Sequence, residues 1–512
     1  MKFFCLVLLA AVASAVWQPW IWPLPQEYLN GTESYIVNHK NLKLSGDDLS
    51  EDLTDGFKRF YDLTFDHSTV EAPEGSIIEV HVAVEDLKAA LKLGVDESYT
   101  LTVSGAKEPV EITAKTVYGA YHAFETLSQM ITYDYYQKLF VIANAPWKIS
   151  DSPRFSHRGV LMDTSRHYES VPSLKKLIDS FTYAKINVLH WHITDSQSQP
   201  SESETFPHFW DGAYSEYEKY TIQDMKDIVE YGRKRGVRVV PEMDVPGHES
   251  SWCTGIPEAC PSQTCREPLD PSSEVTWEAI SSILGEWSGK SVDQGIFPDE
   301  YYHLGGDEVD TGCWSRTDRI VEWMNKNNFT AHDTYKYFVN RAHEIVLGYE
   351  RHGIFWEEVW NNFRTALDKK SIIETWMNKK TANDVVANGY RCIISDPTIY
   401  LDHLDVSWES MYHDEPFEFI DKQEEQDLIM GGEACMWSET VDVSDLLQTV
   451  WPKAAAFAER YWSARDVTNL EDAKPRYMNF RCLLNRRGIQ AAPSLNARAR
   501  SAPGNPGGCY TQ

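Results

Sequence analysis

The chain has 512 residues, 42% hydrophobic and 24% charged, which is typical of a folded globular protein and excludes a disordered, collagenous or disulfide-dense chain. Lys and Arg number 48 against 77 Asp and Glu, so the net charge is −29. Such an acidic chain is a poor partner for nucleic acid, whose phosphates require basic surfaces. Protonation of the 16 His would offset about half of that charge, which suits an acidic compartment.

Residues 1–15 indicate a secretory signal peptide. Lys2 precedes an apolar run at 3–12, and Ala13-Ser14-Ala15 is a typical cleavage site. The run is too short to span a bilayer, and no other segment approaches 18 uninterrupted apolar residues, so we expect no transmembrane helix. The pattern predicts entry into the secretory pathway and leaves open a lysosome-like organelle or secretion.

The cysteines and two sequons fit the same route. Cleavage would remove Cys5 and leave eight of the nine cysteines, some of which should pair in an oxidising compartment. Cys482 and Cys509 bracket the tail 491–512, and we expect a disulfide between them to tie it down. Asn30 and Asn328 each begin an Asn-x-Thr triplet and are predicted glycosylation sites.

Residues 16–150 are predicted to form a small α+β domain. Short β-like runs at 76–84, 99–103 and 109–114 are followed by a helix-like stretch at 119–131. The Asn- and Pro-containing segment 144–153 is expected to be a linker.

Residues 151–490 alternate short apolar runs with amphipathic helical stretches. Eight such repeats are the signature of a (β/α)8 barrel, that is, a TIM barrel. The expected strands are 159–163, 187–195, 237–244, 301–308, 354–359, 372–377, 391–396 and 429–439. Most of these runs end in polar or aromatic residues, and the carboxyl ends of the strands form the active face of this fold.

Asp307 and Glu308 are the sharpest chemical signal, because two adjacent carboxylates end the fourth strand after a Gly pair. Two close carboxyls cannot both ionise easily, so one pKa should rise and keep a protonated acid available. Neighbours on a strand point in different directions, so the pair is badly placed to flank one bond. One carboxyl could donate a proton while the other holds substrate; alternatively, the pair is solvated or caps a helix.

Other strand ends carry candidate binding groups. Arg166 offers a planar fork of donors for sugar hydroxyls or a carboxylate, or it is a structural partner of Asp163 or Asp195. His190 and His192 share a strand face at metal-ligand spacing, but packing or support of the site is favoured over a metal.

A rigid loop and a set of tryptophans complete the predicted site. His248 follows a Pro-Gly turn, which suits either a substrate contact or an ordinary loop histidine. Trp356, Trp376 and Trp437 lie at or near the ends of later strands. Three such rings suggest a hydrophobic pocket that holds a small group such as a methyl.

Five motifs in order resemble the β-N-acetylhexosaminidases of glycoside hydrolase family 20, especially their lysosomal branch. They are RGVLMDTSRHY from Arg158, NVLHWHITD from Asn187, EMDVPGH from Glu242, HLGGDEVD from His303 and GGEACMWSE from Gly431. WPLPQ from Trp22 and ETLSQM from Glu125 resemble the branch's N-terminal non-catalytic domain. The resemblance covers almost the whole mature chain.

The resemblance implies exo-acting hydrolysis of terminal β-linked N-acetylglucosamine or N-acetylgalactosamine. In this family the substrate's own acetamido oxygen attacks C1, so no protein nucleophile is needed. Glu308 would be the general acid and then base, and Asp307 would orient the acetamido group. The implied substrate-binding residues are Arg166, Asp195, His248, Trp356, Trp376, Tyr400, Asp402, Trp437 and Glu439.

We expect neither a metal nor a cofactor, and the resemblance implies a homodimer, with Cys313 paired to Cys260 or Cys265. Two positions depart from the pattern. Ser196 replaces a second Asp, which puts the pH optimum in doubt, and His403 follows the subsite residue Asp402. Two rival interpretations remain: a carbohydrate-binding protein on an inactive barrel, or another barrel hydrolase with a protein nucleophile or a metal.

Overall fold

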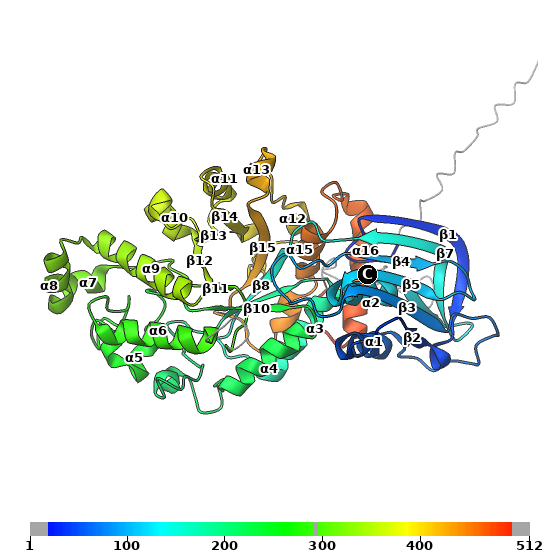
Figure 1. Ribbon diagram of the computed structural model, residues 1–512, viewed down its shortest axis with the longest axis horizontal. Helices are drawn as coiled ribbons and strands as arrows, with labels where there is room; N and C mark the ends of the chain where they lie inside the picture. Colours follow the sequence, from blue (N-terminus) through cyan, green and yellow to red (C-terminus); the bar gives the residue numbers. More distant parts are fainter. Residues whose placement is uncertain (1–18, 290–294, 494–512) are drawn as a thin grey trace, which may run out of the picture.

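The computed structural model describes residues 19–289 and 295–493, which form two packed domains (Figure 1). The predicted signal peptide 1–15 lies outside the described residues. So does the predicted partner of Cys482, because Cys509 falls in 494–512. None of the helices in the described part of the chain is long and apolar enough to cross a membrane.

The N-terminal domain is a seven-stranded mixed sheet with two helices. Its strands follow the order β1-β7-β4-β5-β3-β2, and β6 pairs with β7. The runs expected at 76–84, 99–103 and 109–114 are present as β3, β4 and β5, and the expected helix is α2. The elements are β1 (Glu27–Val37), β2 (Lys43–Ser45), α1 (Glu51–Thr64), β3 (Glu79–Asp86), β4 (Tyr99–Val103), β5 (Val110–Thr116), α2 (Val117–Met130), β6 (Ile131–Asp134) and β7 (Leu139–Asp151).

The expected linker at 144–153 was wrong, because β7 continues to Asp151. Its last part pairs with β1 on one side and β4 on the other, for example through Trp147 with Asn30 and Val103. The residues that suggested a turn mark an irregularity inside this strand: Asn144 has φ 54°, and the register to β1 shifts nearby. An extra residue of this kind bends a strand locally without ending its pairing.

Helix α2 connects the two domains. Nearly all of its residues are buried, since it contacts β4 and β5 on one side and the barrel helix α3 on another. A helix surrounded by packing must give its buried polar side chains hydrogen-bond partners, as His122 has in Glu97 at 2.8 Å.

The second domain is the predicted barrel, closed by eight parallel strands in the order β10-β11-β12-β13-β14-β15-β8-β9. Their residues are almost all buried, as expected when helices cover a parallel sheet. The strands are β8 (His157–Asp163), β9 (Val188–His192), β10 (Arg238–Glu242), β11 (Tyr301–His303), β12 (His352–Trp356), β13 (Ile372–Thr375), β14 (Arg391–Ile394) and β15 (Ile429–Met436).

Helices surround the barrel, several with side-chain caps. Ser170 caps α3, and Thr221 with Asp224 forms a capping box on α4. The helices are α3 (Val171–Tyr183), α4 (Ile222–Arg233), α5 (Trp252–Gly255), α6 (Glu274–Ser288), α7 (Gly312–Arg316), α8 (Asp318–Asn327), α9 (Ala331–Gly348), α10 (Glu357–Phe363), α11 (Lys379–Ala387), α12 (Trp408–His413), α13 (Gln423–Gln426), α14 (Leu446–Val450), α15 (Lys453–Trp462) and α16 (Leu470–Arg486).

Trp22 joins the start of the described chain to its end. The indole N–H donates to the Ala455 carbonyl at 2.8 Å, and the Arg476 guanidinium lies 4.9 Å from the ring centroid. Gln129 on α2 accepts from the Trp22 backbone N–H at 2.7 Å. The segment before β1 is therefore held between α2, α15 and α16.

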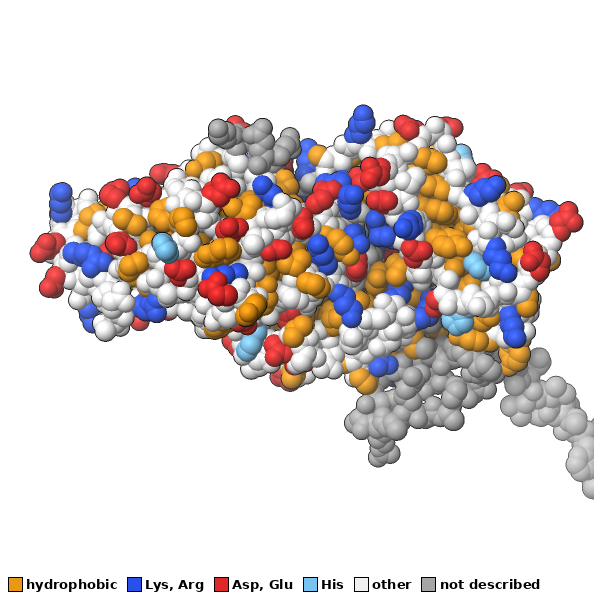
Figure 2. All heavy atoms as spheres, turned by 90° about the horizontal axis from the view of Figure 1, so that it is seen from below, with side chains coloured by type: hydrophobic (Ala, Val, Ile, Leu, Met, Phe, Trp, Pro, Cys, Tyr) orange, Lys and Arg blue, Asp and Glu red, His pale blue; other side chains and the backbone are white. Residues whose placement is uncertain are grey.

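The molecular surface carries both charge signs despite the acidic total. Figure 2 shows acidic and basic side chains interspersed over one face. The predicted glycosylation sites Asn30, on β1, and Asn328, after α8, are both exposed. Each is therefore sterically open to a glycan, and both remain predictions.

A buried ion cluster joins the two domains around Glu97. Its carboxylate accepts from Arg158 of β8 at 2.6 and 3.0 Å, from Asn187 at 3.2 Å, and contacts His122 at 2.8 Å. Burial opposes ionisation, but the Arg158 guanidinium lowers the pKa of Glu97 to about 2. The carboxylate is therefore the counter-charge of a guanidinium that is itself fully buried.

Glu97→Gln is expected to destabilise the protein by about 3–5 kcal/mol, because it leaves the Arg158 charge buried without its partner. The measurement is calorimetric or denaturant unfolding at pH 6. Glu85→Gln is the control, since Glu85 pairs with Lys115 at 2.6 Å on the surface and should change stability by less than about 1 kcal/mol. Equal effects of both variants would contradict the assigned role of Glu97.

Candidate active site

The predicted site residues gather at the carboxyl-terminal ends of the barrel strands. Each follows or ends a different strand, so closure of the barrel brings together positions that are far apart in sequence. In strand order they are Arg166, Asp195, His248, Asp307 with Glu308, Trp356, Trp376, Tyr400 with Asp402, and Trp437 with Glu439. This is the face on which barrels of this type build their sites.

The two adjacent carboxylates lie in different surroundings. The Asp307 side chain is 14% exposed and that of Glu308 is 61% exposed. Glu308 has φ 47°, a left-handed conformation that costs a non-Gly residue energy and is often found at functional sites. At Gly305, with φ 59°, an added Cβ would lie 1.7 Å from Asp244 Oδ1, so a larger residue cannot fit.

The pKa values of Asp307 and Glu308 shift in opposite directions, which corrects the expectation that the raised pKa marks the proton donor. One pKa rises as expected, but it is that of Asp307: burial, then the neighbouring Asp244 carboxyl, raise it well above its usual range. Burial also raises the pKa of Asp244 to about 6. The pKa of Glu308 is lowered, because this exposed carboxyl interacts with His248. In the free protein, therefore, the pair's raised pKa does not mark the predicted acid.

His248 lies between the carboxylates. Its Nδ1 is 3.2 Å from Asp195 Oδ1, and its Nε2 is 3.5 Å from both Asp307 Oδ2 and Glu308 Oε2. Burial opposes a charge on this ring, but the surrounding carboxylates, Asp244 foremost, raise the pKa of His248. An imidazolium here stabilises ionised Glu308 in the free protein.

Arg166 is held by carboxylates at the edge of the site. Its guanidinium lies 2.6 Å from Asp195, 2.9 Å from Asp163 and 3.7 Å from Glu439. The same group lies 5.1 Å from the centre of the Trp437 ring. The pairing of Arg166 with Asp163 and Asp195 is thus present. It holds the guanidinium group beside the Trp437 ring and the exposed Glu439.

The three tryptophans meet, as the sequence suggested. Trp356 and Tyr400 are buried in one small cluster, and Trp376 and Trp437 pack against it partly exposed. Trp356 and Trp437 have ring centroids 5.9 Å apart. Together these four rings, called the aromatic wall below, form an apolar surface. Burial, with a smaller contribution from the Asp307 carboxyl, raises the pKa of the Tyr400 hydroxyl in this wall.

Glu358 supports the wall and was missed from the sequence. Its carboxylate accepts from Trp376 Nε1–H at 2.9 Å, and burial raises the pKa of Glu358 to about 7. The adjacent Glu357 accepts from the Trp376 backbone N–H at 3.0 Å. The WEEVW run contains both residues, but only the fold shows that α10 turns them toward the loop after β13.

The departures noted in the sequence have structural partners. The Ser196 hydroxyl donates to Glu267 at 2.6 Å, so a carboxylate still lies beside this position. Asp402 Oδ2 is 3.9 Å from His403 Nε2, and burial raises the pKa of Asp402. Both contacts lie next to predicted substrate-binding residues.

Two disulfides lie in the loops that follow β10 and β11, which carry His248 and Glu308. Cys265 pairs with Cys313, which decides between the two alternatives for Cys313, and Cys260 pairs with Cys253. The first bond links the chain after His248 to α7, which follows Glu308. The loops that carry these two side chains are therefore covalently connected.

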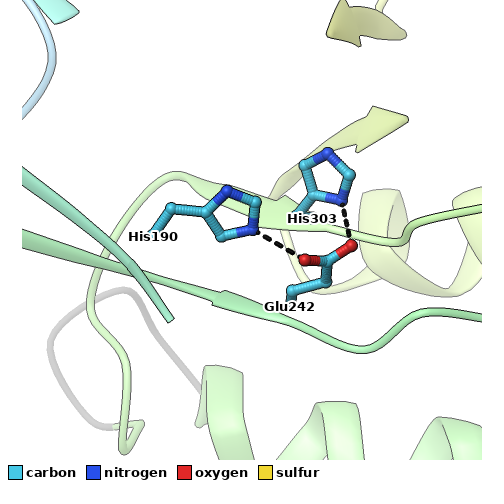
Figure 3. A group of neighbouring side chains, drawn as sticks. All are labelled: His190, Glu242 and His303. Carbon is cyan, nitrogen blue, oxygen red and sulfur yellow. Dashed lines mark ion pairs between the residues drawn. The ribbon is translucent and has the colours of Figure 1, made fainter. Parts of the chain in front are cut away.

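A buried network of histidines and carboxylates lies beneath the site. His190 and His303 point at Glu242 from two sides, with contacts of 3.0 and 2.9 Å (Figure 3). These side-chain types could bind a metal, and the indole N–H of Trp356 also donates to Glu242. The contacts fit a hydrogen-bonded network, in line with the support role favoured for His190 and His192.

Glu169 gives the stability of the protein a predictable pH dependence. Burial raises the pKa of this carboxyl to about 7. Its pKa in the unfolded chain lies near 4.5. The contribution of Glu169 to the free energy of unfolding is therefore fully present below pH 4.5 and is lost as the pH rises toward 7. Glu169→Gln should reduce the loss of unfolding free energy between pH 4.5 and 7.5 by on the order of 2 kcal/mol, measured by urea titration. An unchanged difference would contradict this ionisation.

The fold and site together define a glycoside hydrolase: a barrel whose open face combines paired carboxyls, a fixed guanidinium and an aromatic wall. A model of "Glycosyl hydrolase family 20, catalytic domain" matches residues 155–465, and a "beta-acetyl hexosaminidase like" model matches 21–130. The chain therefore belongs to glycosyl hydrolase family 20, and it is a glycosidase of the β-N-acetylhexosaminidase class.

Individual relatives match nearly the whole chain. Beta-hexosaminidase 1 of Arabidopsis thaliana is 44% identical, over 96% of this chain and 94% of its own length. Beta-hexosaminidase subunit beta of Mus musculus is 34% identical, over 95% and 94%. The solved chitobiase of Flavobacterium johnsoniae superposes with a TM-score of 0.81 at 29% identity, covering 92% of this chain and 73% of that one.

Proposed function

We propose that the protein removes single β-linked N-acetylglucosamine or N-acetylgalactosamine residues from non-reducing ends, with the substrate's acetamido oxygen as nucleophile. The observation that supports this most directly is the unequal carboxyl pair. The Asp307 side chain is mostly buried, at 14% exposed, and that of Glu308 is 61% exposed. Asp307 is thus suited to bind the acetamido group of the substrate, and Glu308 is suited to protonate the glycosidic oxygen of the leaving group.

In the first step, Glu308 donates its proton to the glycosidic oxygen while the acetamido oxygen attacks C1. The C1–O bond breaks and an oxazolinium ion forms. Asp307 accepts the acetamido N–H and stabilises the positive charge that develops there. In the second step, Glu308 takes a proton from water, and this water attacks C1. The oxazolinium ring opens, the acetamido group is restored, and the configuration at C1 is retained.

The remaining site residues bind and orient the sugar. The aromatic wall encloses the acetamido methyl and one face of the sugar, and the Tyr400 hydroxyl donates to the acetamido oxygen. Arg166 and Glu439 bind ring hydroxyls, and Asp402 lies at their edge. Asp195 and His248 orient Arg166 and Glu308, in agreement with their contacts.

Acidic conditions favour the protonated form of Glu308 that the first step requires. The pKa of Glu308 is lowered in the free protein, so its protonated form becomes more populated as the pH falls. We infer that the mature, glycosylated chain works as a homodimer in a lysosome-like organelle or outside the cell, in line with its −29 charge and 16 His. Sedimentation of the secreted protein before and after glycosidase treatment tests both the dimer and the glycans.

A paired assay at acidic pH tests the reaction. One substrate is an aryl β-N-acetylglucosaminide, and the other is the matching aryl β-glucoside. Cleavage of the first alone supports participation of the acetamido group. Cleavage of both would point to a protein nucleophile, and binding without cleavage of either would favour an inactive carbohydrate-binding barrel.

A further inference from the structure

Glu242 contacts both halves of the site from beneath. It ends β10 and is fully buried. Its Oε1 accepts from Trp356 Nε1–H at 2.9 Å, and its Oε2 lies 2.6 Å from His192 Nδ1 and 3.0 Å from His190 Nε2. A single carboxylate is thus shared by the aromatic wall, by two histidines of β9 and by His303 of β11 at 2.9 Å (Figure 3 shows His190 and His303).

His192 continues the contacts into the charged half of the site. Its Nε2 lies 3.0 Å from Asp195 Oδ2. Asp195 in turn contacts Arg166 at 2.6 Å and His248 at 3.2 Å. An unbroken path of direct polar contacts therefore runs from the indole of Trp356 through Glu242 to the imidazole beside Glu308.

We propose that Glu242 is a positioning residue that holds Trp356 and the His192–Asp195 pair in a fixed relation, so that the acetamido oxygen and the acid meet at one carbon. This inference rests on the proposed function, because only an acetamido nucleophile must be aligned with the wall and the acid at once. Misplacement of reacting groups by about 1 Å can cost about 10²-fold in rate.

The role requires a carboxylate and not merely a polar side chain of similar size. The two oxygens of Glu242 both act as acceptors, toward an indole N–H and toward imidazole nitrogens. Glutamine would replace one acceptor oxygen by an NH2 group. A buried donor, on Trp356 or on His192, would then face another donor, and one of the two side chains would have to move.

Glu433 provides a matched control within the same barrel interior. It is fully buried on β15, and its carboxylate also contacts two histidines, His157 at 2.6 Å and His190 at 2.7 Å. His157 is the first residue of β8, so this contact lies toward the end of the barrel opposite the site. Glu433→Gln removes a comparable buried charge that shares His190 with Glu242 but accepts no hydrogen bond from the indole of Trp356.

The experiment compares wild type, Glu242→Gln and Glu433→Gln on an aryl N-acetyl-β-glucosaminide, its N-propionyl analogue and the aryl β-glucoside, with thermal unfolding of each protein. Both variants should lower Tm. Only Glu242→Gln should lower kcat by about 10- to 100-fold with a smaller change in KM. It should also raise the N-propionyl to N-acetyl ratio of kcat/KM by about threefold or more, because a displaced wall readily admits one more methylene.

The outcomes separate the two levels of the proposal. Kinetic changes of equal size in both variants, with unaltered acyl selectivity, would show that Glu242 only stabilises the barrel. Wild-type cleavage of the β-glucoside would overturn the proposed function, and this inference with it. If Glu242→Gln does not fold, Glu242→Asp keeps the charge and withdraws it by one methylene. Its acyl selectivity should shift in the same direction, and an unshifted ratio would overturn the inference.

Discussion

Glu308→Gln should lower kcat toward an aryl N-acetyl-β-glucosaminide by about 10²–10⁴-fold, the range that a general acid contributes. Glutamine keeps the size of the side chain but has no proton to give to the leaving oxygen. Because the other predicted substrate contacts stay in place, affinity for N-acetylglucosamine should change little. Steady-state kinetics at acidic pH and calorimetric titration with the sugar measure the two quantities.

The leaving group provides an internal control for this variant. A dinitrophenyl leaving group departs without protonation, so the first step of Glu308→Gln should be much less impaired with it than with a methylumbelliferyl group. A uniform loss with both leaving groups would argue against proton donation. Near wild-type kcat would refute the assignment of Glu308 altogether.

Asp307→Asn should lower kcat toward the N-acetyl substrate by about 10²–10³-fold, since it removes the group that orients the acetamido and stabilises its developing charge. The folded protein should remain intact. Asp307 is buried beside Asp244 and its pKa is raised, so its ionisation costs stability as the pH rises. Asparagine cannot ionise, and the variant should be at least as stable as wild type at neutral pH.

Asp310→Asn is the matched control, because this exposed carboxyl lies in the same loop and accepts from Gly312 N–H at 2.9 Å. It should retain activity within a few-fold. Kinetics and thermal unfolding of both variants at pH 5 and pH 7 measure these effects. Unchanged turnover of the N-acetyl substrate by Asp307→Asn would contradict an acetamido-orienting role.

Much of the architecture is readable from hydrophobic pattern, because barrel strands are buried on both faces. Each apolar run from 159–163 to 429–439 corresponds to a strand of the closed barrel. The polar residues that follow these runs converge, since all eight strands point the same way. Family membership, first indicated by five motifs, is shown by matches over nearly the whole chain.

Properties that depend on tertiary environment were not predictable in this way. The run at 144–153 contains turn-forming residues, but pairing on both edges makes most of it strand. Adjacency of Asp307 and Glu308 predicted one raised pKa but could not say which carboxyl is buried. Glu242 and Glu358 gave no separate signal, because their importance comes from indole N–H groups that only the folded barrel brings near them.

The contacts of Trp22 limit the order in which the protein can fold during synthesis. Its carbonyl partner on α15 lies 433 residues further along the chain. At 5–20 residues per second, the ribosome delivers that partner roughly 20 to 90 s after Trp22 emerges. The nascent N-terminal sheet can form early. The Trp22 indole, however, cannot make its hydrogen bond until α15 has been synthesised. A chain that stops before α15 would leave a large indole exposed, and quality-control machinery could recognise it as unfinished.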